Sequence, residues 1–313
     1  MTYIIATTNM KGGVGKTTLT VNLATCLVSA HKKRVLVVDV DSQISATLSL
    51  LSPKEFAQRR REKRTLKYLL KQVIQPIHPK ASLATASAIR PYCCHLKGLD
   101  LLPGDLDLYD DYMVSQVLHQ RAQGDVTPSF AASWNELERR LMRDILQPVL
   151  KDYDFIILDC APGYNILTRS SLAASHFYIL PTRPDPLSIA GIQLLERRVR
   201  QLRESHEAEV QLPVQLLGIV FSMSNHPLLN RYGRQVMQRV HETYSDEQIF
   251  KVKIPNDINV SKAVDSFKPV TLLNPQAVGA RAFLQLTQEF LQKLKLMTGL
   301  KEQTSRMSLV HID

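Results

Sequence analysis

The chain has 313 residues, of which 44% are hydrophobic and 22% are charged. These proportions are typical of a globular protein, and no low-complexity segment or internal repeat interrupts the sequence. The formal net charge of +10 and the isoelectric point near 9.4 favour a polyanionic partner, either nucleic acid or an anionic membrane.

Several classes of protein are disfavoured by what the sequence lacks. No apolar run approaches the roughly 18–20 residues of a transmembrane helix, and the N-terminus leads directly into a predicted strand rather than a secretory leader. The four cysteines form no C-x-x-C pair, so reduced cytosolic thiols are expected. Adjacent Cys93 and Cys94, followed by His95, make a poor metal site because they have no evident distant partner ligands.

A glycine-rich loop near the N-terminus lies between a predicted strand at residues 3–6 and a predicted helix at residues 19–28. The strand is a short apolar run, and leucine, valine and alanine recur at helical spacing after the loop. A strand, a glycine loop and a helix in this order predict a phosphate-binding loop, where backbone N–H groups and the helix N-terminus hold the phosphates.

Two lysines distinguish this loop. Lys16 is expected to reach the β- and γ-phosphates, and the hydroxyl of Thr17 is expected to ligate Mg²⁺. The usual pattern G-x-x-x-x-G-K-[ST] would place its first glycine at Met10, whereas this chain has a second lysine at position 11. The extra cation either adds charge to its own site or reaches the nucleotide of a second subunit. The predicted phosphate-binding residues are Lys11, Gly12, Gly13, Val14, Gly15, Lys16, Thr17 and Thr18.

The string K-G-G-x-G-K-T-T resembles the loop of the ParA/MinD family of deviant Walker A ATPases, and the ParA branch in particular. We therefore expect an α/β P-loop fold with a doubly wound, mostly parallel sheet and helices on both faces. The resemblance implies ATP and Mg²⁺ as cofactors and an ATP-dependent sandwich homodimer. It also implies that Lys11 crosses the dimer interface to the ATP of the partner subunit.

A second predicted strand, at residues 34–41, ends in two acids. Its long apolar run is typical of a strand buried on both faces of a parallel sheet, and ligand sites in such sheets lie at the carboxyl ends of strands. We expect Asp39 to contribute to the Mg²⁺ site and Asp41 to orient the attacking water, with Lys11 and Lys16 stabilising transition-state charge. The family pattern is D-x-D-P-Q, and Ser42 stands here where proline is usual.

Two further stretches complete the predicted nucleotide site. The strand at residues 153–159 resembles a Walker B strand, so Asp159 is expected to hold Mg²⁺ through water, and residues 160–163 occupy the place of the family's γ-phosphate-sensing turn. Residues 251–257 resemble the family strand and loop that line the adenine, with Asn256 in place of the usual arginine. The predicted adenine contacts are Pro255, Asn256 and Asp257.

The remaining pattern predicts one ATPase domain over residues 1–300 and a polar tail over residues 301–313. Strands are expected at residues 98–104, 176–181 and 216–221. Helical segments are expected at residues 53–71, 105–118, 134–150, 189–204 and 281–297, with a loop insertion at 124–133. Within the first of them, residues 65–70 resemble the family's short T-L-x-x-L-L helix.

Basic residues gather in several places. The charged segment at residues 53–71 is either a solvated helix face or a DNA contact. By resemblance to the family, the predicted DNA-binding residues are Arg197, Arg198, Arg200, Arg231 and Lys262. Scattered Lys and Arg side chains give weak, salt-sensitive and sequence-blind binding, and a dimer joins two such patches.

The resulting hypothesis is a cytoplasmic, nucleoid-associated ATPase that binds non-specific DNA as an ATP dimer and positions a cargo. A ParB-like or McdB-like adaptor would stimulate hydrolysis, and the cargo, a plasmid, a chromosome or a carboxysome, is not encoded in these residues. A MinD-like membrane ATPase is the alternative, disfavoured because no C-terminal amphipathic anchor is evident, so no membrane partner is expected. A metal-cluster ATPase of the same superfamily is disfavoured by the missing C-x-x-C.

Overall fold

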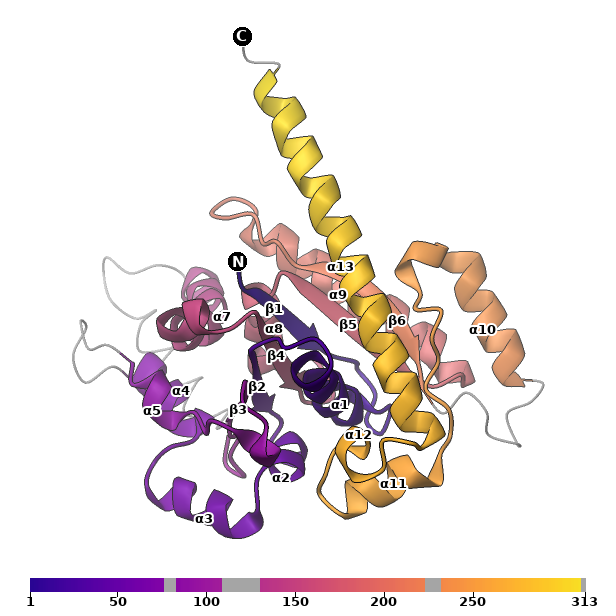
Figure 1. The fold of residues 1–313 in the computed structure, drawn as a ribbon. Coiled ribbons are helices and arrows are strands. Elements are labelled where there is room, and N and C mark those ends of the chain that lie inside the picture. The colour runs from indigo at the N-terminus through magenta and orange to yellow at the C-terminus, as the bar shows by residue number, and fades with distance from the viewer. Residues whose placement is uncertain (76–82, 109–129, 223–231, 311–313) are drawn as a thin grey trace.

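The computed structural model describes residues 1–75, 83–108, 130–222 and 232–310. A six-stranded sheet forms the centre, and every pair of neighbouring strands is parallel, in the order β3-β2-β4-β1-β5-β6 (Figure 1). The strands are β1 (Tyr3–Thr7), β2 (Val35–Val40), β3 (Leu99–Leu102), β4 (Phe155–Cys160), β5 (Phe177–Thr182) and β6 (Gln215–Phe221).

The sheet is doubly wound, because the chain moves from β1 towards the β3 edge first and towards the β6 edge afterwards. The predicted fold class is confirmed. The register pairs Thr7 with Asp159 and Asp159 with Asp39, so the carboxyl ends of β1, β2 and β4 lie side by side. The loops that follow these three strands therefore meet at one edge of the sheet, where ligands bind in such folds.

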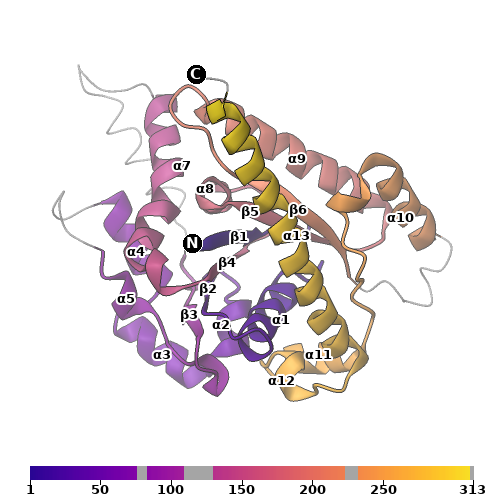
Figure 2. The ribbon, with the colours of Figure 1, turned by 45° about the horizontal axis from the view of Figure 1, so that its top comes forward.

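Helices cover both faces of the sheet (Figures 1 and 2). One face carries α1 (Lys16–Ser29), α2 (Ser45–Leu50), α3 (Pro53–Arg61), α11 (Ile258–Asp265), α12 (Val270–Leu273) and α13 (Val278–Val310). The other carries α4 (Leu66–Ile74), α5 (Thr85–Ala88), α7 (Phe130–Leu146), α8 (Ile166–Ala174), α9 (Pro186–His206) and α10 (Tyr232–Thr243). Short 3₁₀ turns are η1 (Cys93–His95), η2 (Gln147–Asp152) and η4 (Asp246–Gln248).

The strands divide their side chains between two cores. Ile5 packs under α1 and α13, whereas its neighbours Ile4 and Ala6 pack on the opposite face, because successive strand residues point to opposite sides. All six residues of β2 and all six of β4 are buried. Continuous apolar runs of this kind are what a parallel sheet covered on both faces requires.

The predicted element boundaries differ from the structure in several places. The helical segment at 53–71 is two helices, since a left-handed residue, Lys63 (φ 60°), ends the first. Helix α7 begins at Phe130, before the predicted 134, and α13 runs to Val310 rather than ending at 297. Residues 251–257 form no regular strand, only a bridge from Ile254 to Ser222.

The predicted helix at 105–118 and the predicted loop at 124–133 lie largely outside the described residues. Within the described residues, no helix has the combination of length and hydrophobicity that crossing a membrane would need.

Candidate nucleotide-binding site

The glycine loop that links β1 to α1 is shaped by left-handed backbone. Gly13 (φ +70°) and Gly15 (φ +89°) adopt conformations that favour glycine, and Gly15 is the residue from which α1 starts. No side chain caps the start of α1, so its first N–H groups face the loop without a side-chain acceptor. Asn9 braces the loop because its Nδ2 donates to the carbonyl of Pro181 (2.7 Å) and its Oδ1 accepts from the amide of Lys11 (3.0 Å).

Lys16 lies folded over this loop. Its Nζ donates to the carbonyl oxygen of Lys11 at 2.9 Å, and the residue is almost entirely shielded from solvent. Burial lowers the pKa of Lys16, and the nearby carboxylates of Asp159 and Asp41 partly offset that effect. A largely desolvated ammonium beside the backbone amides of a glycine loop is suited to bind phosphate oxygens.

Asp159, at the end of β4, is the acid that contacts α1. Its Oδ2 accepts from the hydroxyl of Thr17 at 2.7 Å and its Oδ1 from the hydroxyl of Thr20 at 2.9 Å. Burial, followed by repulsion from Asp39, raises the pKa of Asp159 to about 7. The carboxylate is therefore held next to the Thr17 hydroxyl in a site that favours a nearby cation.

Asp39 has protein partners on both carboxylate oxygens. Oδ2 accepts from the backbone N–H and the hydroxyl of Thr47, both at 2.7 Å, and Oδ1 accepts from the amide of Asp41 at 3.2 Å. Burial raises the pKa of Asp39 to about 6. Gly104 packs directly against Asp39. A side chain at position 104 would place its Cβ only 3.0 Å from the carbonyl oxygen of Asp39. These contacts fix the turn between β2 and α2, and Asp39 does not line the groove described next.

A groove of about 630 Å³ runs beside the loop at the carboxyl edge of the sheet. Asp41 lies in it close to Lys16 and Thr17, and its Oδ1 accepts from the amide of Gln43 at 3.0 Å. Pro162, in the turn after β4, also lines the groove. It lies close to Gly12, because a side chain at position 12 would bring its Cβ into ordinary van der Waals contact with the proline ring. The groove therefore brings together the loop lysine, a hydroxyl and an acid.

The predicted adenine residues line a separate, small cleft of about 40 Å³. Pro255, Asn256 and Asp257 lie in it with Gly15 and Thr18 of the loop. The carboxylate of Asp257 also caps the start of α11: it accepts from the backbone amides of Asn259 (2.8 Å) and Gly279 (2.8 Å), and these bonds lower the pKa of Asp257 against the opposing effect of burial.

Lys11, the second loop lysine, forms an ion pair within its own chain. Its Nζ lies 2.7 Å from Oδ2 of Asp185, the residue before α9, and its side chain is 42% exposed. The other oxygen of Asp185 is buried and has no hydrogen-bond partner among the described residues. An exposed pair of this kind is weak and can be exchanged at small cost.

The predicted DNA-binding residues are not gathered in one patch of a single subunit. Arg197, Arg198 and Arg200 are exposed on α9, and Arg200 lines a cleft of about 740 Å³ beside the first residue of β6. Lys262 is exposed on α11, whose neighbouring residues line the groove at the opposite end of the strands. Arg231 lies outside the described residues.

Three functional neighbours were missed by the sequence analysis. Thr20 could have been found, because it lies three residues after Thr17 on the same face of α1 and shares Asp159 with it. Thr47 and Asp185 carry no local signal, since their partners Asp39 and Lys11 are brought to them only by the tertiary fold.

The comparisons with known proteins agree with this geometry. The model of a family described as "AAA domain" matches residues 2–212. The sporulation initiation inhibitor protein Soj of Bacillus subtilis is 29% identical, with 92% of this chain and 98% of Soj covered, and the chromosome partitioning protein ParA of Caulobacter vibrioides is 27% identical, with 93% and 94% covered.

Among solved structures, the ATP complex of a McdA variant from Cyanothece superposes with a TM-score of 0.65 at 17% identity, covering 93% of this chain and 96% of that one. At this identity the likeness concerns the fold. The family match covers most of the chain, and the loop, the strand order and the relatives agree with it. The chain therefore belongs to the AAA domain family and is a ParA/MinD-type ATPase.

Proposed function

We propose that this protein is a ParA-type positioning ATPase that closes into a sandwich homodimer on ATP·Mg²⁺ and binds DNA without sequence preference in that state. The observation that carries the proposal is the groove, in which Lys16, Thr17 and Asp41 lie beside the glycine loop. Names of relatives that refer to chromosome partitioning support a role in segregation.

The residues of the groove fit a magnesium–nucleotide complex. Mg²⁺ is usually held by one or two protein oxygens together with phosphates and water, and Thr17 with Asp159 provides such a pair. No group of three or more His, Cys, Asp or Glu side chains suited to a metal occurs in the described part of the chain, so phosphates and water would complete the shell. Bound Mg²⁺ would neutralise charge on the β- and γ-phosphates, while Asp41 would orient the attacking water.

Lys11 is proposed to leave Asp185 and reach the ATP of the partner subunit. The change is inexpensive, because an exposed ion pair is worth only about 0–1 kcal/mol. A triphosphate carries more negative charge than the single carboxylate of Asp185, and attraction between opposite charges is stronger where an interface excludes water. Dimerisation would thus depend on the nucleotide through this lysine.

Substitution of Lys11 by alanine is expected to keep some ATP binding and to abolish the ATP-dependent dimer, measured by light scattering with a non-hydrolysable ATP analogue. Asp185→Ala is the matched control, because it breaks the same intrachain pair but leaves the lysine in place. We expect this control to dimerise. A Lys11→Ala protein that dimerises as well as the wild type would refute the proposed role.

The DNA-binding surface is proposed to include the exposed arginines of α9. Arg200→Ala is expected to weaken binding to random-sequence duplex DNA several-fold and to lower the salt dependence by about one counterion, because one phosphate contact is lost. ATP hydrolysis without DNA should be unchanged. Arg143→Ala, on α7, removes an equally exposed arginine elsewhere and should leave DNA binding intact; equal losses in both variants would show a net-charge effect only.

The whole proposal is tested by DNA binding in two nucleotide states. Tight binding with the ATP analogue and weak binding with ADP is the expected result, whereas equal binding in both contradicts it. An adaptor of the ParB or McdB kind is proposed to stimulate hydrolysis, and the cargo is proposed to be a plasmid, a chromosome or a carboxysome. ATP-dependent sedimentation with anionic liposomes would instead favour the MinD-like alternative.

Two further expectations remain proposals. The protein is expected in the cytoplasm and on the nucleoid, which imaging of a fluorescent fusion would test. Residues 1–300 are expected to form one ATPase domain, with 301–313 as a polar tail, although the structure continues α13 through Val310.

A further inference from the structure

The end of α3 carries more positive charge than its surroundings neutralise. Residues 53–71 contain eight Lys or Arg residues and only two acids. Three of these cations form ion pairs: Arg60 with Asp105 and Asp107, Lys67 with Asp107, and Arg64 with Glu62. The last turn of α3 holds three arginines, and positive charge is stabilised by the negative end of the helix dipole. The dipole explains why cations lie at this end of the helix, but not why their side chains come together.

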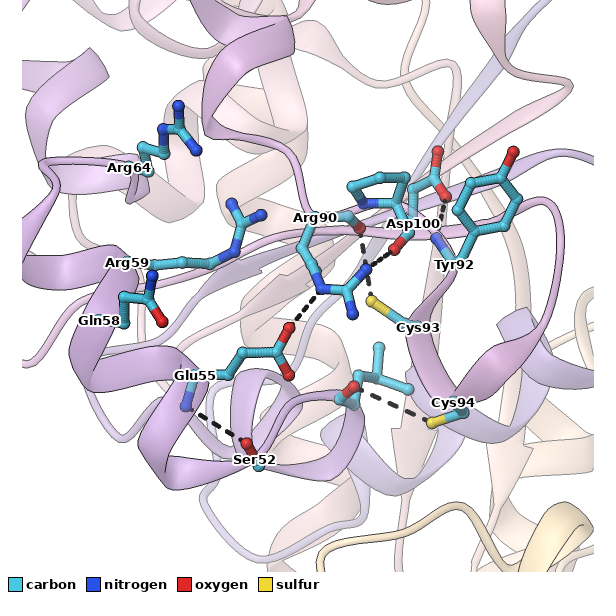
Figure 3. Close-up of polar contacts among 12 residues, drawn as sticks. Ser52, Glu55, Gln58, Arg59, Arg64, Arg90, Tyr92, Cys93, Cys94 and Asp100 are labelled. Carbon is cyan, nitrogen blue, oxygen red and sulfur yellow. Dashed lines mark hydrogen bonds and ion pairs between the residues drawn. The ribbon is translucent and has the colours of Figure 1, made fainter.

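Three guanidinium groups converge here. Arg64 is turned back onto the end of α3, because its amide donates to the carbonyl of Arg59 at 2.8 Å after the left-handed residue Lys63. Figure 3 shows the side chain of Arg59 between Arg64 and Arg90. Burial lowers the pKa of Arg59, and the charges of Arg90 and Arg64 lower it further, so the three charges lie within interaction range.

The cluster is short of anions. Arg90 donates to Glu55 (2.5 Å), and Arg64 has only a long contact with Glu62 (3.4 Å). The one hydrogen bond of the Arg59 side chain goes to the carbonyl of Ala88, at 3.0 Å (the rest of its donors have no acceptor among the described residues). A half-buried guanidinium between two like charges is unfavourable unless an anion with several acceptor oxygens compensates it.

We propose that Arg59, Arg64 and Arg90 form a second phosphate-binding site, which takes a backbone phosphate of DNA. Guanidinium forks match phosphate geometry. A polyanion suits the site better than a small anion because the charge continues past the cluster to Arg61 and Lys63, which are exposed and form no ion pair with any described residue. The inference adds to the proposed function and does not require the dimer.

This site would contact different phosphates from those at α9. Helix α3 belongs to the connection between β2 and β3 at one edge of the sheet, whereas α9 connects β5 to β6 at the other. With strands about 4.8 Å apart, the two edges of a six-stranded sheet are separated by roughly 24 Å. One subunit would therefore hold two separate stretches of DNA backbone, and the α3 site would act in both nucleotide states.

The test compares two double variants of equal charge. Arg61→Gln with Arg64→Gln removes one guanidinium group of the proposed site and one exposed cation that continues its charge. Arg140→Gln with Arg143→Gln removes two exposed arginines of α7 as the control. Binding of a labelled random-sequence duplex is followed by fluorescence anisotropy over a salt series, with ADP and with the ATP analogue. ATP hydrolysis by both variants, which should match the wild type, verifies the fold.

We expect the α3 variant to lower the slope of log affinity against log salt by about 2, because each lost phosphate contact lowers it by about 0.9. The loss should appear with ADP and with the analogue, and the α7 control should behave as the wild type. An unchanged slope would overturn the proposal. The proposal would also be overturned if inorganic phosphate shifted the NMR signals of the arginine side chains while the α3 variant bound DNA as the wild type does. If the wild type bound DNA equally with ADP and with the ATP analogue, the proposed function would be contradicted. The comparison of the α3 variant with the α7 control would still test the phosphate site.

Discussion

Lys16→Ala is expected to lower ATP hydrolysis by at least ~100-fold, the loss typical of removing one preorganised group from a developing anion. Lys16 lies inside the glycine loop, where its Nζ donates to the carbonyl of Lys11 and two carboxylates lie near enough to affect its pKa. The bound triphosphate would take over this donor. Without it, the loop amides would face the β- and γ-phosphates with no mobile cation between them.

The same variant is expected to lose ATP-dependent DNA binding, because the proposed closed dimer would not form without a bound triphosphate. Lys32→Ala is the matched control: its Nζ also donates to a backbone carbonyl, that of Ser29, but lies on an exposed turn. Hydrolysis is measured by phosphate release and nucleotide binding by calorimetry. Wild-type hydrolysis in Lys16→Ala, with the fold verified by circular dichroism, would show that another residue performs this role.

The nucleotide loop could be predicted from sequence because its requirements are local. Left-handed glycines, an apolar strand before the loop and an apolar helix after it are all close together in the chain, and each has a sequence pattern of its own. The mostly parallel sheet could be predicted in the same way, since continuous apolar strands alternating with helices favour a parallel sheet.

Long-range contacts could not be predicted. The ion pair between Lys11 and Asp185 joins residues 174 positions apart, and nothing in either local pattern indicates the partner. The role of Asp39 at the metal site, predicted from its position at a strand end, stays a prediction. Its hydrogen bonds to Thr47 could not be predicted, because Thr47 is brought to the end of β2 only by the fold.

Boundary errors had a similar cause. A short helix at 65–70 was expected from its resemblance to the family, but the turn at Lys63 has no glycine to mark it, so the return of Arg64 onto the end of α3 could not be predicted. That undetected turn creates the arginine cluster (Figure 3). The charge of the segment was visible in sequence, whereas its convergence on Arg59 depended on a backbone conformation that most residues avoid.

Asp159→Asn is expected to abolish most Mg²⁺-dependent hydrolysis and, at the same time, to stabilise the protein without nucleotide at high pH. Burial and repulsion by Asp39 raise the pKa of Asp159 in the folded state from 3.8 to about 7. At pH ~3 and below, the carboxyl is protonated in both the folded and unfolded states. As the pH rises towards 7, ionisation favours the unfolded state, so the free energy of unfolding of the wild type falls.

Asparagine never ionises and can still bond the hydroxyls of Thr17 and Thr20. In EDTA at pH 8 we expect the variant to gain about 2 kcal/mol, since one pKa unit is 1.36 kcal/mol and the two buried acids share the shift. This gain corresponds to a rise in Tm of roughly 3 °C in a domain of about 300 residues, since the entropy of unfolding is about 2.1 cal/mol/K per residue. At pH ~3, below both pKa values, the two proteins should melt within about 1 °C of each other. Asp246→Asn, at an exposed carboxylate, is the control and should show no such pH dependence.

Magnesium and ATP should reverse the order of stability. The wild type would gain Tm on adding Mg·ATP at pH 8, because the cation offsets the charge of Asp159, whereas the variant has lost that charge and should gain much less. Hydrolysis by the variant is expected to fall at least ~100-fold, because the Mg²⁺ that would stabilise the developing charge on the phosphates would be held less well. A variant that melts below the wild type in EDTA at pH 8, or that gains equally from Mg·ATP, would show that Asp159 holds the fold and not the metal.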